Sequence, residues 1–179
     1  RNKLLSLSGM YNGEMLSAPE YKSLAGLDGA GFHGGYNHIV YQMVGQPLGV
    51  FYLPHSTGLE SDGNGGYTYG IADLNGGGVS LEDGEDRYVA GQAVPKTILG
   101  SNISFRYKRF DLSLQVNGAF GHKIYNGTSL TYMNMNIFPD YNVMKKAPKQ
   151  NIKDQTATDY WLEKGDYVNF DYVTLGWNV

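Results

Sequence analysis

The chain has 179 residues, with 14 Lys and Arg against 17 Asp and Glu, and a formal net charge of −3. This balance, without a basic stripe, gives no electrostatic footprint for nucleic-acid binding. Cysteine is absent, which excludes disulfides, thiolate catalysis and zinc sites built on cysteine.

The residue types narrow the class of protein further. Charged residues make up 17% of the chain and aromatic residues 13%, with 15 tyrosines and 25 glycines. This composition is typical of membrane β-barrels and of some secreted β proteins. No apolar run is long enough for a membrane-spanning helix, so strands are the remaining way to cross a bilayer. The first residues, Arg1-Asn2-Lys3, resemble neither an initiator methionine nor a signal peptide, and we expect a mature or internal fragment.

The first third of the chain predicts little regular structure. Residues 3–11 alternate in polarity and predict a strand. Residues 12–43 are rich in glycine without a sustained period, and we expect a long loop. Residues 44–52 predict a short extended segment whose Pro47 and two glycines suit a sheet edge, bulge or kink better than a central strand.

Residues 56–96 predict a second irregular region. A tight hairpin follows over 99–120, and residues 122–160 predict a third long connection. The last element, 166–179, carries apolar residues on one parity before Asp171 and on the other after Tyr172, so we expect a bulge or a turn there. No helix, repeat or domain boundary is predicted.

The hairpin over 99–120 is the strongest local prediction, because its side chains alternate strictly. One face collects apolar residues with Ser101, and the other collects polar residues, with Lys108-Arg109-Phe110-Asp111 between the strands. The members of the apolar face are Leu99, Ile103, Phe105, Tyr107, Leu112, Leu114, Val116 and Phe120. Such a hairpin fits either a sheet packed on a core or a membrane barrel with lipid outside and a wet lumen inside.

One glycine-rich segment is a candidate calcium loop. Asp73 and Asn75 place oxygens at alternate positions, as calcium loops do. Gly77 stands where another Asp or Asn is expected, and the nearby acidic residues compensate only if the loop folds back. Those residues are Glu82, Asp83, Glu85 and Asp86. A solvated turn is the preferred interpretation, and no metal ligand is assigned.

Other side chains offer little chemistry. We interpret Asp86-Arg87 as a salt bridge that anchors its loop rather than as a charge pair that contacts a ligand. The four histidines, His33, His38, His55 and His122, lack metal-ligand spacing, and no nucleophile motif is present. We expect no catalytic residue, no cofactor and no enzymatic activity.

Aromatic residues in the predicted connections are better candidates for ligand contact, because flat rings stack on sugars and peptides at small entropic cost. They are Tyr125, Tyr132, Phe138, Tyr141 and Tyr160. The alternative is that they pack the loops together or form an aromatic girdle. No substrate-binding residue is assigned.

Several motifs occur together in a fixed order. They are Gly45-Gln46-Pro47-Leu48-Gly49-Val50-Phe51-Tyr52, Asp73-Leu74-Asn75-Gly76, Asp86-Arg87 with Pro95-Lys96, Tyr107-Lys108-Arg109-Phe110-Asp111-Leu112-Ser113, Gly121 with Ile124-Tyr125-Asn126, and Gly165-Asp166-Tyr167 with Thr174-Leu175-Gly176-Trp177. In this order they resemble the C-terminal portion of SusC/RagA-type TonB-linked outer-membrane transporters of Bacteroidetes.

The resemblance implies an all-β fold, antiparallel strands from the C-terminal part of a plugged barrel of about 22 strands. Residues 1–179 would form one partial barrel domain, with the plug domain and the TonB box lying outside the chain. The family imports glycan oligosaccharides or peptides across the outer membrane. Its partners are a SusD-like surface lipoprotein, which closes the barrel as a lid, and the TonB-ExbB-ExbD complex, which supplies energy.

Two other classes of protein stay open on the sequence. One is a secreted or surface β-sandwich that binds carbohydrate, which requires a second sheet over the apolar face. The other is a calcium-stabilised adhesion domain, which depends on Asp73 and Asn75. Few further strands are evident for a second sheet, and this favours the barrel.

Overall fold

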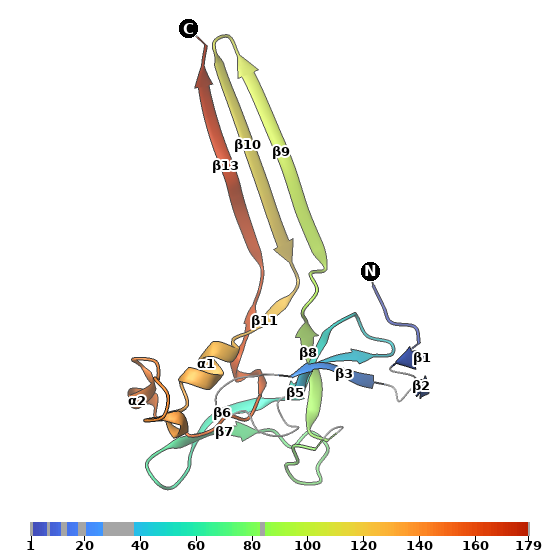
Figure 1. Cartoon of the computed structure of the whole chain (residues 1–179), viewed down its shortest axis with the longest axis vertical. Coiled ribbons are helices and arrows are strands. Elements are labelled where there is room, and N and C mark those ends of the chain that lie inside the picture. The colour runs from blue at the N-terminus through green and yellow to red at the C-terminus, as the bar shows by residue number, and fades with distance from the viewer. Residues whose placement is uncertain are drawn as a thin grey trace.

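The computed structural model describes residues 2–6, 8–11, 14–17, 21–26, 38–82 and 85–178. The described chain is mostly antiparallel β-strand with little helix, as expected for an all-β fold. Figure 1 shows a tall three-stranded arm rising from a wider base. None of the helices in the described residues is long and apolar enough to cross a membrane.

The arm consists of three strands of 11 residues each, in the order β13-β10-β9. They are β9 (Thr97–Tyr107), β10 (Phe110–Phe120) and β13 (Tyr167–Trp177). The predicted hairpin is confirmed, with Phe105 opposite Leu112 and Ile103 opposite Leu114. Its turn is tighter than expected: only Lys108 and Arg109 lie between the strands, and Lys108 adopts a φ of 53°.

The predicted bulge in the last strand is also confirmed. Tyr172 lies opposite Gln115 and Phe170 lies opposite Val116, so Asp171 is the extra residue. The extra residue changes the parity of β13 and returns its apolar residues to one face.

The base contains the remaining elements. They are β1 (Ser8–Tyr11), β2 (Glu14–Ser17), β3 (Tyr21–Gly26), β4 (His38–Met43), β5 (Val50–Pro54), β6 (Ser56–Ser61), β7 (Tyr67–Ile71), β8 (Arg87–Gln92), β11 (Lys123–Tyr125), α1 (Gly127–Tyr132), η2 (Met135–Ile137), α2 (Ala147–Gln150), η3 (Asp159–Trp161) and β12 (Leu162–Lys164). Strands β3-β4-β5-β8 form one sheet, and β1-β2, β6-β7 and β11-β12 form pairs.

Several sequence predictions for the N-terminal half are wrong. Residues 12–43, where a long loop was expected, contain β2, β3 and β4, and residues 56–96, where an irregular region was expected, contain β6, β7 and β8. These strands have at most six residues, and their ladders join segments that the local pattern cannot relate. The remainder of 12–43, residues 12–13, 18–20 and 27–37, lies outside the described residues.

Two neighbouring predictions hold only in part. Residues 3–11 form a strand only from Ser8, while Leu4 exchanges backbone hydrogen bonds with Gly45 and Gln46. Residues 44–49 form a turn with positive φ at Gly45 and Gly49, as the predicted kink requires. The edge alternative is wrong for residues 50–52, since β5 lies between β4 and β8 and is buried throughout. The bulge alternative is confirmed, because the pairing of β5 with β8 shifts register between Phe51 and Tyr52.

The prediction that residues 122–160 contain no helix is also wrong. Asn126 caps α1, because its side-chain oxygen accepts a hydrogen bond from the Ser129 amide at 2.9 Å. Leu130 of α1 is fully buried in the core of the base, which shows why this short helix is stable. The core otherwise collects Ile39, Phe51, Leu53, Tyr69, Ala90, Ile152 and Ala157.

Candidate functional site

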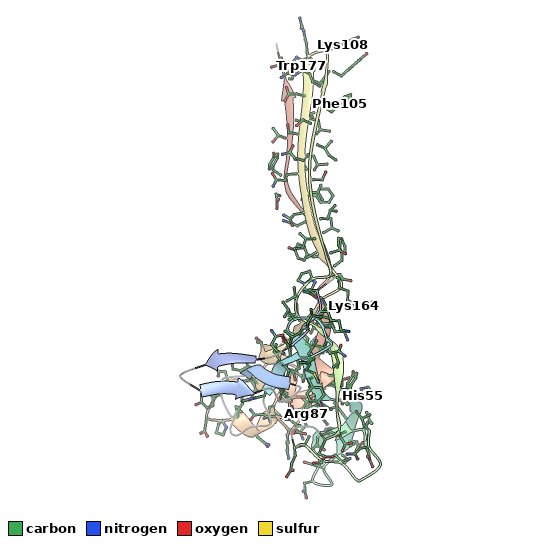
Figure 2. All side chains as sticks on the ribbon, turned by 90° about the vertical axis from the view of Figure 1, so that its right-hand side faces the viewer. His55, Arg87, Phe105, Lys108, Lys164 and Trp177 are labelled. Atoms are coloured by element: carbon green, nitrogen blue, oxygen red, sulfur yellow. The ribbon has the colours of Figure 1, made fainter. Side chains whose placement is uncertain are left out.

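The arm presents one continuous apolar face. Figure 2 shows side chains projecting from both sides of the thin arm, well clear of the base. Ten large residues of this face are 44–73% exposed: Leu99, Ile103, Phe105, Tyr107, Phe110, Val168, Phe170, Val173, Leu175 and Trp177. Among the described residues, no second sheet covers them.

The exposed area of this face is large enough to cost much of the stability of a domain. Full burial of a large apolar side chain contributes about 1.5–3 kcal/mol, so ten half-exposed ones forgo on the order of 10 kcal/mol. That sum is comparable with the whole stability of a typical domain, about 5–15 kcal/mol. The face therefore requires an apolar covering. The carbohydrate-binding sandwich expected as the alternative lacks its second sheet in the described chain.

The opposite face of the arm is polar and built around the bulge. The Asp171 carboxylate accepts hydrogen bonds from the side-chain amides of Gln115, Asn117 and Asn169 at 3.2, 2.6 and 2.9 Å. Asn102 donates to the Tyr172 hydroxyl at 3.2 Å. Ile98 and Tyr167, which both lie opposite Ala119 close to the base, are large apolar exceptions on this face. Amide side chains suit a wet surface, because water can satisfy their remaining hydrogen bonds.

Both outer strands of the arm have an unpaired edge. Within the described residues β9 and β13 each pair only with β10. The other edge of each strand presents backbone N–H and C=O groups over 11 residues. Exposed edges of this length require further strands, above all in an apolar environment.

The dimensions of the arm suit a bilayer. Eleven residues extend about 36 Å, and a tilt near 45° reduces the height to about 26 Å, close to the apolar band of a membrane barrel. Aromatic rings gather at the tip: Phe110 packs edge-on against Trp177 with centroids 4.6 Å apart, and Lys108 lies over Tyr107 at 5.3 Å. Such rings mark the interface between lipid and water.

Hydrogen bonds to carboxylate side chains hold the loops of the base in place. Asp86 is buried and accepts hydrogen bonds from the amides of Leu74, Asn75 and Ser80. Although burial opposes it, the amides of Ser80, Leu74 and Asn75 hold the pKa of Asp86 below its ordinary value. Arg87 donates to the His38 and Leu81 carbonyls and to the Tyr41 hydroxyl. Each of the two side chains thus anchors its loop through hydrogen bonds of its own, so the anchoring role is confirmed. The salt bridge between Asp86 and Arg87 stays a prediction.

The candidate calcium residues serve the same loop. The Asp73 carboxylate accepts hydrogen bonds from the amides of Gly76 and Gly78, and the Asn75 oxygen accepts one from Gly77. Their oxygens therefore stabilise a local turn. In the part of the chain that the structure describes, no three acidic or histidine residues gather as a metal site. Asp83 and His33 lie outside that part.

A second carboxylate joins distant parts of the base. Asp159 accepts hydrogen bonds from the Ser56 amide, the Tyr88 hydroxyl and His55 Nδ1, each at 2.7 Å. Burial raises the pKa of Asp159, but these three hydrogen bonds outweigh it and hold the pKa below its ordinary value. This group leaves no local pattern in the sequence, because its partners lie 71–104 residues away.

The aromatic candidates separate into two sets. Tyr160 stacks near Tyr69 and Trp161, and burial raises the pKa of Tyr125, so these rings belong to the packing of the base. Tyr132, Phe138 and Tyr141 are 41–58% exposed in the segment after β11. The second set is available to a ligand or partner, and Tyr160, which is 37% exposed, is partly available as well.

Comparison with known proteins gives one informative similarity. No family model matches the chain. The chain is 28% identical to TonB-dependent receptor P3 of Formosa agariphila, over 75% of the chain and 15% of that relative. It therefore spans only a small part of the length of the protein it matches. The similarity supports the TonB-dependent receptor family in general, in line with the resemblance drawn from the motifs.

Proposed function

We propose that the chain forms part of the barrel wall and the outer loops of a TonB-dependent receptor that imports nutrients across an outer membrane. The observation that carries the proposal is the arm, which is apolar along one face, polar along the other and unpaired at both edges. Lipid covers the apolar face, and strands outside the chain pair with the edges. No catalytic step belongs to this function.

The arm also suggests an orientation. Outer-membrane barrels have short periplasmic turns and long extracellular loops. The two-residue turn at Lys108 and Arg109 then lies on the periplasmic side, and the base lies at the cell surface. Within this scheme the polar face around Asp171 lines the lumen.

The finer assignment is a SusC/RagA-type transporter with residues 1–179 as a partial barrel domain. The ordered motifs from Gly45 to Trp177 support it. Under this assignment a SusD-like lipoprotein covers the base, glycan oligosaccharides or peptides enter between them, and TonB-ExbB-ExbD drives release through a plug outside these residues. The exposed rings of Tyr132, Phe138 and Tyr141 are candidates for contact with the lid or the substrate.

Fractionation of cells that carry the native protein tests the proposal. We expect the protein in the outer membrane, together with a co-purifying lipoprotein. Recovery as a soluble secreted monomer would contradict the barrel proposal and favour the carbohydrate-binding sandwich. Loss of thermal stability on chelation would instead favour the calcium-stabilised domain.

Two substitutions at neighbouring positions sharpen this test. Leu114 lies on the apolar face and Gln115 on the polar face of the central strand. We expect Leu114→Lys to reduce the assembled receptor strongly, since a lysine facing lipid near the midplane costs about 2–4 kcal/mol. Gln115→Lys adds the same charge toward the lumen and should leave assembly close to wild type. Equal effects of the two changes would contradict a lipid-facing sheet.

A further inference from the structure

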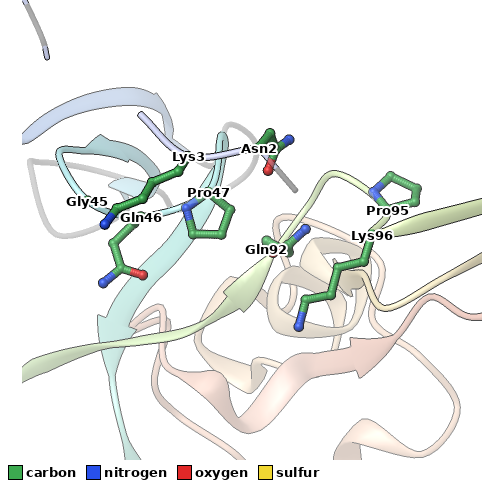
Figure 3. Close-up of a pocket in the computed structure, with 8 residues that line it drawn as sticks. All are labelled: Asn2, Lys3, Gly45, Gln46, Pro47, Gln92, Pro95 and Lys96. Atoms are coloured by element: carbon green, nitrogen blue, oxygen red, sulfur yellow. The ribbon is translucent and has the colours of Figure 1, made fainter. Parts of the chain in front are cut away.

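A cleft rich in lysine lies where the arm joins the base. Two adjoining cavities, of about 780 and 420 Å³, share Gln46, Pro47, Gln92 and Lys96 in their walls. Figure 3 shows the larger cavity, with Lys3 on one side and Lys96 on the other. We call the two cavities together the junction cleft.

The charge of the junction cleft is opposite to that of the chain. Its walls contain Lys3, Lys96, Lys123 and Lys164 but only one carboxylate, Asp166. That carboxylate accepts a hydrogen bond from the Gly121 amide at 2.6 Å. Within the described residues none of the four lysines lies within ion-pair distance of an acid. Four positive charges thus face one cleft in a chain whose net charge is −3.

Two of these lysines are neighbours across a strand pair. Lys123 of β11 lies directly opposite Lys164 of β12. Like charges placed directly opposite each other on a ladder destabilise it. An anion between the two ammonium groups would convert this repulsion into attraction.

The backbone makes room for the lysine stems. A Cβ atom at Gly91 would lie 2.9 Å from Cδ of Lys123. At Gly121, where φ is 76°, a Cβ atom would lie 3.0 Å from the Lys96 side chain. Both stems are therefore held against glycines on neighbouring segments.

The junction cleft lies at the end of the polar face of the arm, which is the face proposed to line the lumen. Lys96 immediately precedes β9 and continues the alternation of Asn102 and Ser104, which lie on the polar face. In the proposed orientation the cleft sits at the outer mouth of the wall, above the polar face. A solute that enters the lumen from the surface passes this point.

We propose that the junction cleft binds an oxyanion group, a sulfate, phosphate or carboxylate, of the soluble ligand that the receptor imports. This inference rests on the proposed function and specifies its ligand as anionic. Lysine ammonium groups bind such oxygens by charge-assisted hydrogen bonds without requiring one fixed geometry. Lipid headgroups of the outer leaflet present the same chemistry, and the experiment separates the two sources.

The test uses the full-length receptor in nanodiscs of zwitterionic phosphatidylcholine. The probes are dextran sulfate and neutral dextran of equal length, at fixed ionic strength. The variant is Lys123→Gln with Lys164→Gln, and the matched control is Lys145→Gln with Lys149→Gln, which removes the same charge from exposed positions near α2.

We expect wild type and control to bind dextran sulfate in preference to neutral dextran, and the Lys123/Lys164 variant to bind it at least about tenfold more weakly. Equal binding by the two double variants, or no preference for the sulfated polymer, would overturn the proposal. Loss of wild-type binding when anionic phosphatidylglycerol is added to the disc would also overturn it, by assigning the lysines to lipid headgroups.

Membrane sorting distinguishes a failure here from a failure of the proposed function. The Lys123/Lys164 variant should reach the outer membrane in wild-type amounts, because neither lysine lies in the arm. A receptor that sorts normally but shows no anion preference contradicts only the anionic ligand and leaves the proposed function standing. Absence of the wild-type protein from the membrane would contradict the transport function itself.

Discussion

Asp159 connects three segments of the base through one carboxylate. Its oxygens accept from Ser56 at the start of β6, from His55 before it, and from Tyr88 of β8. The side chain of Asp159 is 14% exposed, so these hydrogen bonds form in a partly dry environment. Asp159 therefore holds η3 against two strands that are distant in sequence.

The lowered pKa of Asp159 predicts the direction of a pH effect. An unfolded aspartate titrates near 3.8, and the folded group titrates below that value. The stability that Asp159 contributes is complete above pH 3.8 and is lost as the pH falls through the folded pKa. Asp62 and Asp86, whose pKa values are also lowered, act in the same direction.

We expect Asp159→Asn to destabilise the base at pH 7 by on the order of 1 kcal/mol, a discounted value because the group is partly solvated. The variant should also lose less stability than wild type as the pH falls below 3.8, since one titrating carboxylate is removed. Thermal unfolding of the full-length receptor, followed by a fluorescent label on a single cysteine introduced in the base, measures both effects. Identical pH profiles for variant and parent would exclude a stabilising role for the Asp159 charge.

At the scale of the elements, the sequence predicts the arm well. Alternation over 11 residues is a strong signal, because a shift of one residue would turn every apolar side chain to the other face. The same signal locates the bulge, since Phe170 and Val173 can share a face only if one residue between them is extra. The resemblance to TonB-linked transporters adds the environment that this alternation alone leaves open.

The base could not be predicted in the same way. Strand β5 is buried on both sides, so it shows no alternation, and Pro54 and Gly49 at its ends resemble loop residues. Strands β6 and β7 carry Gly58 and Gly70, and their pairing is irregular at Gly58. Contacts such as Tyr88 to Asp159 depend on the assembled fold and leave no local pattern.

Deletion of Asp171 tests the account of the bulge. Because Asp171 is the extra residue, its removal keeps Tyr172 opposite Gln115 and Phe170 opposite Val116. We expect the deletion to assemble close to wild type, with some loss of stability from the hydrogen bonds to Asp171. Deletion of Ser113 in the regular part of β10 is the control, and it should abolish assembly by placing Leu112 next to Leu114.

Heat-modifiable migration in gels, together with the amount in the membrane, measures assembly for both deletions. If the Asp171 deletion fails as completely as the Ser113 deletion, the bulge does more than adjust parity. If the Ser113 deletion assembles normally, the faces of β10 are not fixed by lipid and lumen.

At the scale of the whole molecule, the arm and the base have different roles. The arm supplies a wall with an apolar and a polar side, and it closes only with strands beyond its two edges. The base supplies a packed core, anchored loops and the junction cleft. Figure 1 places the free end of the arm and the C-terminus together, away from the base. This arrangement fits a membrane wall with a structured surface region.

The most direct measurement of the central claim is lipid contact along β10 in the assembled receptor. Single cysteines at positions 112–117 would each carry a bimane label in nanodiscs that contain spin-labelled lipid. We predict strong quenching at Leu112, Leu114 and Val116. Little quenching is expected at positions 113, 115 and 117, whose side chains lie on the polar face and point toward the lumen. Equal quenching at all six positions, or none at any of them, would contradict a sheet with lipid on one side and water on the other.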